Sequence, residues 1–212
     1  FGTPHRITVA PPDSGDKTLV DCEPGKITLS WSYDTLLTFP VANFFGPQTQ
    51  WRLVLRPSID GEKLAQSTWH RLDGWLPALH SEFAHPTVDT TFEVIGSPRA
   101  AIVQVQFHNR DRVVHRASVD CGVAKPWPGV SPAFVDPGLP QNARDALIAG
   151  WMARADRVLI AGLGGEDYVD SANAFASAVN LAPGETKTLW FVRPYRVYES
   201  MLPELRRRDW AQ

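Results

Sequence analysis

The sequence predicts an all-β, mainly antiparallel fold, built as one large sandwich of two sheets. Apolar and polar residues alternate with period two over many short stretches, which places the large side chains of each stretch on one face of a strand. Proline and glycine separate these stretches at short intervals, and few segments show the period of a helix. The 212 residues are enough for two sheets larger than those of a seven-stranded immunoglobulin sandwich.

The first half of the chain carries the clearest alternation. Large side chains occupy every second position in four stretches, at residues 27–33, 51–55, 88–94 and 101–107. Each is expected to form a strand with one buried face. A polar turn at 109–112 follows the last of them, and 113–119 is expected to return as a second strand. Two such stretches joined by a short turn predict a β-hairpin.

The second half is more ambiguous. Residues 142–155 are rich in Ala, Leu, Met and Arg, which favours a helix, but strands at 146–151 and 157–163 fit the pattern equally well. The Ala-rich stretch 171–181 has the same two interpretations. The many prolines of 126–140 predict a surface loop.

The chain is expected to end on a strand and a helix. Residues 181–185 predict a turn, and 186–192 a strand. Residues 202–210 predict a helix with Pro203 in its first turn. One domain is therefore expected at 1–200, followed at 201–212 by the beginning of a linker helix.

Composition excludes several classes of protein. Hydrophobic residues make up 43% of the chain, which is typical of a globular domain, and the formal net charge of -2 provides no basic patch for nucleic acid. No apolar run approaches the roughly 18–20 residues that span a bilayer. Phe1 opens no secretory signal, which slightly favours a cytoplasmic location, although a removed signal peptide would leave the same start.

Cys22 and Cys121 are too few for a disulfide scaffold. Both fall in expected strands, so they are either two reduced, buried thiols or a single inter-strand bridge. No CxxC pair or nearby histidine accompanies them, and no metal site is predicted.

The glycine-rich stretch 158–165 is the most tempting cofactor motif. It resembles the entry to a dinucleotide-binding loop, but Asp167 stands where the third glycine is needed, and a carboxylate there would repel phosphate. A loop that uses glycine for a positive φ explains the stretch. The adjacent carboxylates, which are Glu166, Asp167 and Asp170, are expected to be solvated. No cofactor is predicted.

The sequence contains no motif for nucleophilic or metal-dependent catalysis. The chain has no Gly-x-Ser-x-Gly elbow, and neither cysteine has a catalytic signature. His80 and His85 flank a segment that Pro86 ends, without the spacing of zinc ligands. No catalytic residue is predicted.

Residues 67–83 concentrate aromatic and polar side chains in a segment with few strand signals. Aromatic platforms beside charged and imidazole groups are typical of sugar-binding proteins. The alternative is that the tryptophans plug the end of the sandwich. The candidates for a surface facing carbohydrate or another domain are Trp69, His70, Arg71, Asp73, Trp75 and His80.

Three stretches together carry a family resemblance: 69–83 with its Gly-Trp-Leu-Pro, 100–109 ending in Asn109, and 181–195 with its Pro-Gly-Glu turn and Arg-Pro-Tyr ending. The sequence resembles the N-terminal β-supersandwich domain, of galactose mutarotase-like fold, found in bacterial glycoside hydrolases of the six-hairpin, glucoamylase-like class. In that family an α/α-toroid catalytic domain follows, and residues 202–210 are similar to the linker helix that leads into it.

The resemblance implies a non-catalytic accessory domain that packs on the toroid of the same parent chain, with the Trp69–Phe83 loop reaching towards its sugar cleft. Two alternatives remain open: a free-standing carbohydrate-binding module, and a small mutarotase-like enzyme in which His70 or His80 does acid–base work on a sugar hydroxyl. The sequence identifies no partner carboxylate for either histidine. A docking face left exposed on the isolated domain would favour self-association.

Overall fold

The computed structural model describes residues 6–9, 18–31, 52–74, 76–97, 100–124, 151–154, 157–171 and 174–194. Apart from one 3-10 turn at Leu72–Gly74, every regular element in these ranges is a β-strand. All pairings between these strands are antiparallel. The predicted all-β, two-sheet fold is confirmed.

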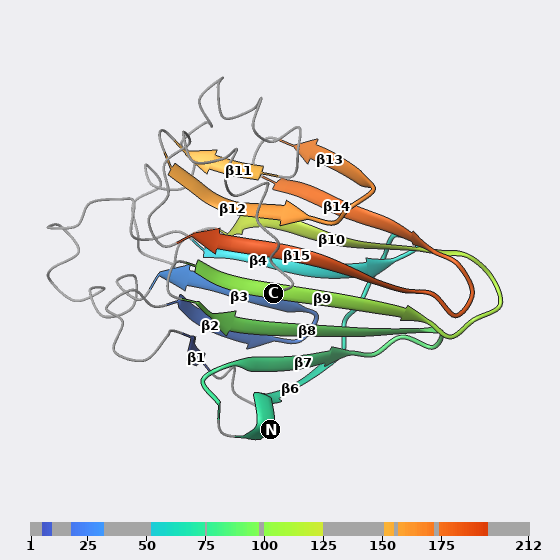
Figure 1. Cartoon of the computed structure of the whole chain (residues 1–212), viewed down its shortest axis with the longest axis horizontal. Coiled ribbons are helices and arrows are strands. Elements are labelled where there is room, and N and C mark those ends of the chain that lie inside the picture. The colour runs from blue at the N-terminus through green and yellow to red at the C-terminus, as the bar shows by residue number, and fades with distance from the viewer. Residues whose placement is uncertain are drawn as a thin grey trace, which may run out of the picture.

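Eight strands form the first sheet: β1 (Arg6–Val9), β2 (Thr18–Glu23), β3 (Lys26–Trp31), β4 (Arg52–Ile59), β5 (Glu62–Lys63), β10 (His115–Ala124), β13 (Asp167–Ser171) and β14 (Ala174–Leu181). Their order is β1-β2-β3-β4-β10-β14-β13, and the short β5 pairs with β4. Only two of its pairings, β4 with β10 and β10 with β14, join strands that are not consecutive in the chain (Figure 1).

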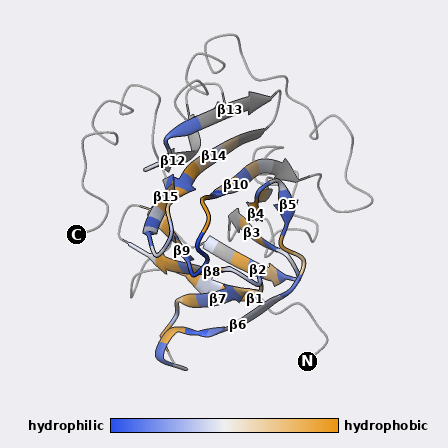
Figure 2. Ribbon diagram, turned by 90° about the vertical axis from the view of Figure 1, so that its right-hand side faces the viewer, coloured by the Kyte–Doolittle hydropathy of each residue, from blue (hydrophilic) through white to orange (hydrophobic). Residues whose placement is uncertain are grey.

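Seven strands form the second sheet: β6 (Ser67–Arg71), β7 (Leu79–Phe83), β8 (Val88–Gly96), β9 (Ala100–Asn109), β11 (Trp151–Arg154), β12 (Arg157–Leu163) and β15 (Thr186–Pro194). Their order is β11-β12-β15-β9-β8-β7-β6. Figure 2, which looks along the strands, shows the two layers, with β9 and β15 in one and β4 and β10 in the other.

The core lies between the sheets and consists of alternate residues of the facing strands. Leu53 and Leu55 of β4, Phe92 of β8 and Phe107 of β9 are fully buried, as the period-two pattern predicts. Each such side chain contributes about 1.5–3 kcal/mol by leaving water. Arg193 is also fully buried, and its Nη1 donates to the Thr18 hydroxyl, which joins β15 to β2 across the sandwich.

The predicted hairpin at 101–119 is wrong, although both of its strands exist. β9 pairs with β8 and β15, whereas β10 pairs with β4 and β14, so the connection 110–114 crosses from one sheet to the other. The link from β14 to β15 crosses back in the same way. A short polar turn is compatible with either path, and only the pairing of distant strands decides between them.

Asn109 joins these two crossings. Its side chain is fully buried, and Nδ2 donates to the carbonyl oxygens of Val113, Leu181 and Ala182 at 2.8, 3.0 and 3.1 Å. Its Oδ1 accepts from the N–H of Asp111 at 2.8 Å. One amide therefore satisfies backbone groups of both connections, and its loss would leave several buried polar groups without partners.

The turn at 181–185 closes this arrangement from the other side. The Gly184 N–H donates to the Asn109 carbonyl at 3.0 Å, and the Asn109 N–H donates to the Glu185 carbonyl at 2.9 Å. Gly184 has a φ of +72°, which favours glycine. The predicted turn and the strand that follows it are confirmed.

The ambiguous segments are strands wherever the structure describes them. Residues 157–163 form β12, paired with a strand that begins at Trp151, and 174–181 form β14. The alanines of β14 sit between β10 and β13, where tertiary pairing overrides helix propensity. The segment 67–83 was expected to be poor in strands; instead it forms the hairpin of β6 and β7.

Several expectations lie outside the described residues. They are the helix or strand at 142–150, the Pro-rich loop at 126–140, the linker helix at 202–210, the boundary at 200/201 and the position of Trp75.

The alternative of a disulfide is wrong, because Cys22 and Cys121 are both free and buried. They share one cross-strand row, but β3 and β4 stand between them. Three steps of about 4.8 Å place their Cα atoms roughly 14 Å apart, twice the separation that a bridge allows. Burial, with the charge of Asp21 adding, raises the pKa of the Cys22 thiol to about 12, and burial also raises the pKa of Cys121.

We expect neither thiol to react with Ellman's reagent in the folded protein at mildly alkaline pH, since both are buried and protonated. Both should react in concentrated guanidinium chloride without any reductant. Labelling of the unfolded chain only after reduction would contradict the assignment of free thiols.

We expect Asn109→Asp to lower the free energy of unfolding by about 2–4 kcal/mol, because a carboxylate at this position faces three carbonyl oxygens and cannot donate to them. Urea unfolding at neutral pH measures the loss. The matched control is Gln106→Ala, an exposed change on the same strand, which should cost less than about 0.5 kcal/mol. Equal stability of the two variants would show that the Asn109 amide does not join the connections.

Candidate functional site

The outer face of the seven-stranded sheet carries a group of polar and aromatic side chains that the strand register aligns. Cross-strand pairs connect His70 of β6, His80 of β7, Glu93 of β8, Gln104 of β9 and Trp190 of β15. Directly paired residues of neighbouring strands point to the same side of a sheet. These five residues, termed the outer row, therefore project together, away from the core.

His80 of the outer row lies between two carboxylates and a second imidazole. Its Nδ1 donates to Glu93 Oε1 at 3.1 Å, its Nε2 lies 3.5 Å from Glu82 Oε1, and its side chain is 17% exposed. The ring of His70 lies beside it, with ring centroids 4.8 Å apart. The hydrogen bond to Glu93 therefore orients the His80 ring, while Nε2 has only the longer contact with the exposed Glu82.

Uncharged polar groups continue the face beside the outer row. Thr91, Gln106 and Thr188 are cross-strand neighbours in the next outward row, and His108 Nδ1 lies 2.8 Å from the Thr186 hydroxyl beyond it.

No lysine or arginine occupies an outward position of β6 to β9 or β15 in the described ranges. The outward carboxylates of these five strands are those of Glu82, Asp89 and Glu93, and Asp89 is already paired with Arg110 Nε at 2.8 Å. The carboxylates beside His80 disfavour a polyanionic ligand at that place.

The same face is apolar and covered towards the end of the sandwich where β9 begins. Ala100, Ile102 and Val192 alternate with core residues and so point outward, yet all three are buried. Ile95 of β8, which pairs with Ile102, is 40% exposed at the margin of this covered part. The accessible part of the face therefore runs from Ile95 across the outer row to the end of β9, and it is mainly polar.

The sequence-predicted candidates divide between the two faces of the β6–β7 hairpin. Trp69 is paired with the buried Ser81 on the inward side and packs against the core, whereas His70 and His80 project outward. The structure thus brings His70 and His80 together and separates both from Trp69.

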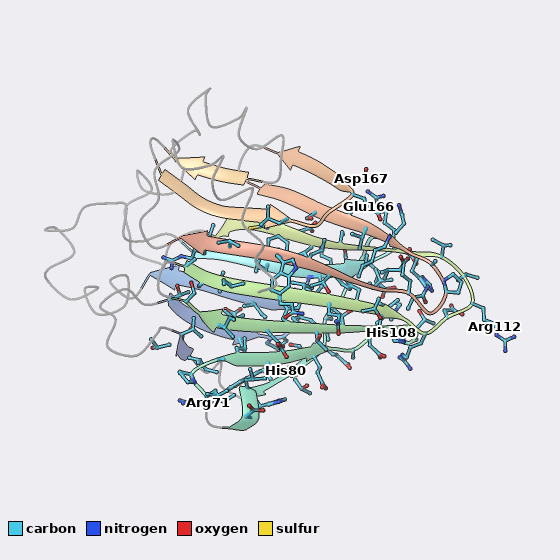
Figure 3. All side chains as sticks on the ribbon, viewed as in Figure 1. Arg71, His80, His108, Arg112, Glu166 and Asp167 are labelled. Carbon is cyan, nitrogen blue, oxygen red and sulfur yellow. The ribbon has the colours of Figure 1, made fainter. Side chains whose placement is uncertain are left out.

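The remaining candidates lie at the end of the hairpin. Arg71 is exposed at the end of β6, where it pairs with the buried Leu79 and so lies on the side of the strand opposite to His70 (Figure 3). Asp73 is exposed in the 3-10 turn and has a φ of +52°. Their part in binding remains a prediction.

Two of the carboxylates near the glycine-rich stretch, Glu166 and Asp167, form ion pairs at the rim, and the side chain of Asp170 lies outside the described part of the chain. Glu166 accepts from Lys187 Nζ at 2.5 Å, and this hydrogen bond lowers the pKa of the carboxyl. Asp167 pairs with Arg116 at 2.8 Å. Gly164 has a φ of +85°, as expected of a glycine turn, and a Cβ there would lie 2.9 Å from the Thr188 carbonyl oxygen. These features are accounted for by structure alone.

Within the described ranges, no three His, Cys, Asp or Glu side chains are grouped so that they could hold a metal ion. Nor does that part of the chain contain a helix of the length and apolarity that a membrane crossing requires.

Sequence reasoning missed Glu93, Gln104 and Trp190 as members of a site. Their alternation with buried residues already indicated a shared side within each strand. Nothing in the sequence indicated that β9 pairs with β15, which is what joins Trp190 to the other four residues.

Comparison with known proteins finds no matching family model and no matching curated sequence. Among solved structures, the chain is similar to a mutant heparan sulfate lyase from Pedobacter heparinus, with 13% sequence identity and a TM-score of 0.45. The alignment covers 93% of this chain but 38% of the lyase, so the chain spans well under half of that protein's length. A likeness at this level says nothing about the activity of this chain.

Proposed function

We propose that the chain is a non-catalytic accessory domain of a carbohydrate-active protein, and that the accessible outer face of its seven-stranded sheet is the surface that binds sugar. The observation that carries the proposal is the outer row, in which strand pairing aligns an indole, a carboxamide, a carboxylate and two imidazoles.

The chemistry of this surface suits a neutral polysaccharide. An indole such as that of Trp190, which is partly exposed, can cover the apolar face of a sugar ring. The amides of Gln104 and Gln106 and the hydroxyls of Thr91 and Thr188 offer both donors and acceptors to sugar hydroxyls. Sheet strands hold these groups in a fixed spacing, which reduces the entropy lost on binding.

The choice between a non-catalytic role and a mutarotase-like one depends on His80. General acid–base catalysis needs a nitrogen within hydrogen-bond reach of a substrate hydroxyl. Glu93 holds Nδ1 at 3.1 Å, and Nε2 lies 3.5 Å from the exposed Glu82, which competes with a sugar hydroxyl for that nitrogen and favours the non-catalytic role.

The family resemblance supports a second candidate role, in which this sandwich packs on a helical toroid of the same parent chain. That role needs a long helical continuation of the parent reading frame beyond Gln212. Both roles are accessory, and binding measurements on the isolated chain separate them, because only the first requires affinity for a soluble polysaccharide.

We expect the chain to be retarded in native gels that contain soluble neutral polysaccharides and not in gels that contain polyanionic ones. Trp190→Ala should weaken the retardation roughly three- to tenfold, the contribution of one aromatic contact. Arg116→Ala, an exposed change on the eight-stranded sheet, is the matched control and should bind like the wild type. Retardation by no neutral polysaccharide would rule out the sugar-binding face.

We also expect the isolated chain to show no catalytic turnover. Anomer interconversion of free sugars, followed by polarimetry, and release of reducing ends from polysaccharides should both stay at the uncatalysed rate. Turnover that disappears in a His80→Gln variant would overturn the non-catalytic assignment.

A further inference from the structure

We propose that His115 and His85 form a pH-dependent clasp, which joins the two sheets at the end of the sandwich where β9 passes into β10. The clasp requires His115 to be protonated and His85 to be neutral, so it is complete only near neutral pH. It contains no residue of the outer row and is independent of the proposed function.

His115 is held between two carboxylates. Its Nδ1 donates to Asp60 Oδ2 at 2.6 Å, its Nε2 to Asp111 Oδ2 at 3.1 Å, and its side chain is 11% exposed. Only the imidazolium carries a proton on both nitrogens. The neutral ring would turn a lone pair towards one of the carboxylates and lose that hydrogen bond.

His85 requires the opposite state. Its Nδ1 accepts from the backbone N–H of Val88 at 3.2 Å and lies 3.4 Å from that of Thr87. A proton on Nδ1 would remove this acceptor. The two imidazole rings stand edge to face with centroids 6.3 Å apart, and the Thr87 hydroxyl lies 3.3 Å from both His85 Nδ1 and His115 Nε2. A second positive charge at His85 would repel the first.

These contacts cross the sandwich. Asp60 lies in the turn between β4 and β5, and His115 begins β10, both in the eight-stranded sheet. His85 and Thr87 lie between β7 and β8 of the other sheet. Asp111 belongs to the connection from β9 to β10, next to Arg112 at the tip in Figure 3. The clasp therefore fastens this connection and both sheets together.

The charges around each histidine act in the required directions. The hydrogen bond to Asp60 has the largest effect and raises the pKa of His115. Burial acts the other way, and the hydrogen bond to Asp111 adds to the rise, so the net direction is upward. Burial and the charge of His115 lower the pKa of His85, with Arg110 acting the same way and Glu62 and Asp60 opposing.

The carboxylates of the clasp stay ionised throughout the range of histidine titration. At Asp60, hydrogen bonds from the Arg116 N–H and from His115 outweigh burial and lower the pKa. The Arg112 N–H, followed by His115, lowers the pKa of Asp111. The stability that these two groups contribute is lost only in acid, below their ordinary pKa of about 3.9.

The two histidines together should give the free energy of unfolding a maximum as a function of pH. The raised pKa of His115 contributes stability that is complete below the unfolded value of about 6.5 and is lost as pH rises through the folded value. The lowered pKa of His85 contributes stability that is complete above about 6.5 and is lost as pH falls through the folded value. The free energy of unfolding should therefore decline on both sides of about pH 6.5, with one histidine responsible for each side.

Urea unfolding between about pH 5 and pH 8, the range in which histidine titrates, tests this division. We expect His115→Gln to flatten the alkaline decline and His85→Gln the acid one. His108→Gln is the matched control, because His108 has the uncharged Thr186 hydroxyl as its partner; both declines should persist in it. Persistence of both declines in His115→Gln or in His85→Gln would overturn the clasp.

Histidine resonances of the wild-type protein provide a test that does not depend on the folding of any variant. The midpoint of His115 should lie above that of an unfolded-peptide histidine, and the midpoint of His85 below it. Asp111→Asn, which keeps the shape of the side chain, should lower the His115 midpoint. Midpoints at the unfolded value, or in reversed order, would refute the proposal.

Discussion

The arrangement of the two sheets depends on one buried carboxamide. Asn109 donates to carbonyl groups of both connections that pass between the sheets, and it accepts from one of them. Because β9 and β10 separate at this point, each is free to pair with strands that are distant in sequence. Without that separation the two strands could close on each other as a hairpin, and neither sheet could form in its observed order.

Polar ties at the two ends complement the apolar core between them. The hydrophobic effect brings the sheets together but is not directional, so it does not by itself select one register. Hydrogen bonds are directional, and those of Asn109 at one end and Arg193 at the other join specific strands. The clasp around His115 adds a charged tie at the Asn109 end, within the same connection.

The outer row follows from this register. Its five residues come from five strands, and a shift of one residue in any pairing would move a member to the core side. The candidate face therefore depends on the ties at the sandwich ends. The members of the outer row were only partly predictable from the sequence. Alternation placed Glu93 and Gln104 on the side of their own strands that faces away from the core, but which residues lie beside them is decided by strand pairing.

The sequence by itself determined the fold class, the strands β3, β4, β8 and β9 with the buried side of each, and the turn at 181–185, because period-two burial and glycine chemistry are local properties. Tertiary structure decided which strands pair. Because of this pairing, the predicted hairpin is a crossing between the sheets, and the Ala-rich segment and residues 67–83 form strands. The same pairing separates Cys22 from Cys121. The physical reason is that pairing is chosen by the burial and hydrogen bonding of the whole sheet, to which residues far apart in the chain contribute together.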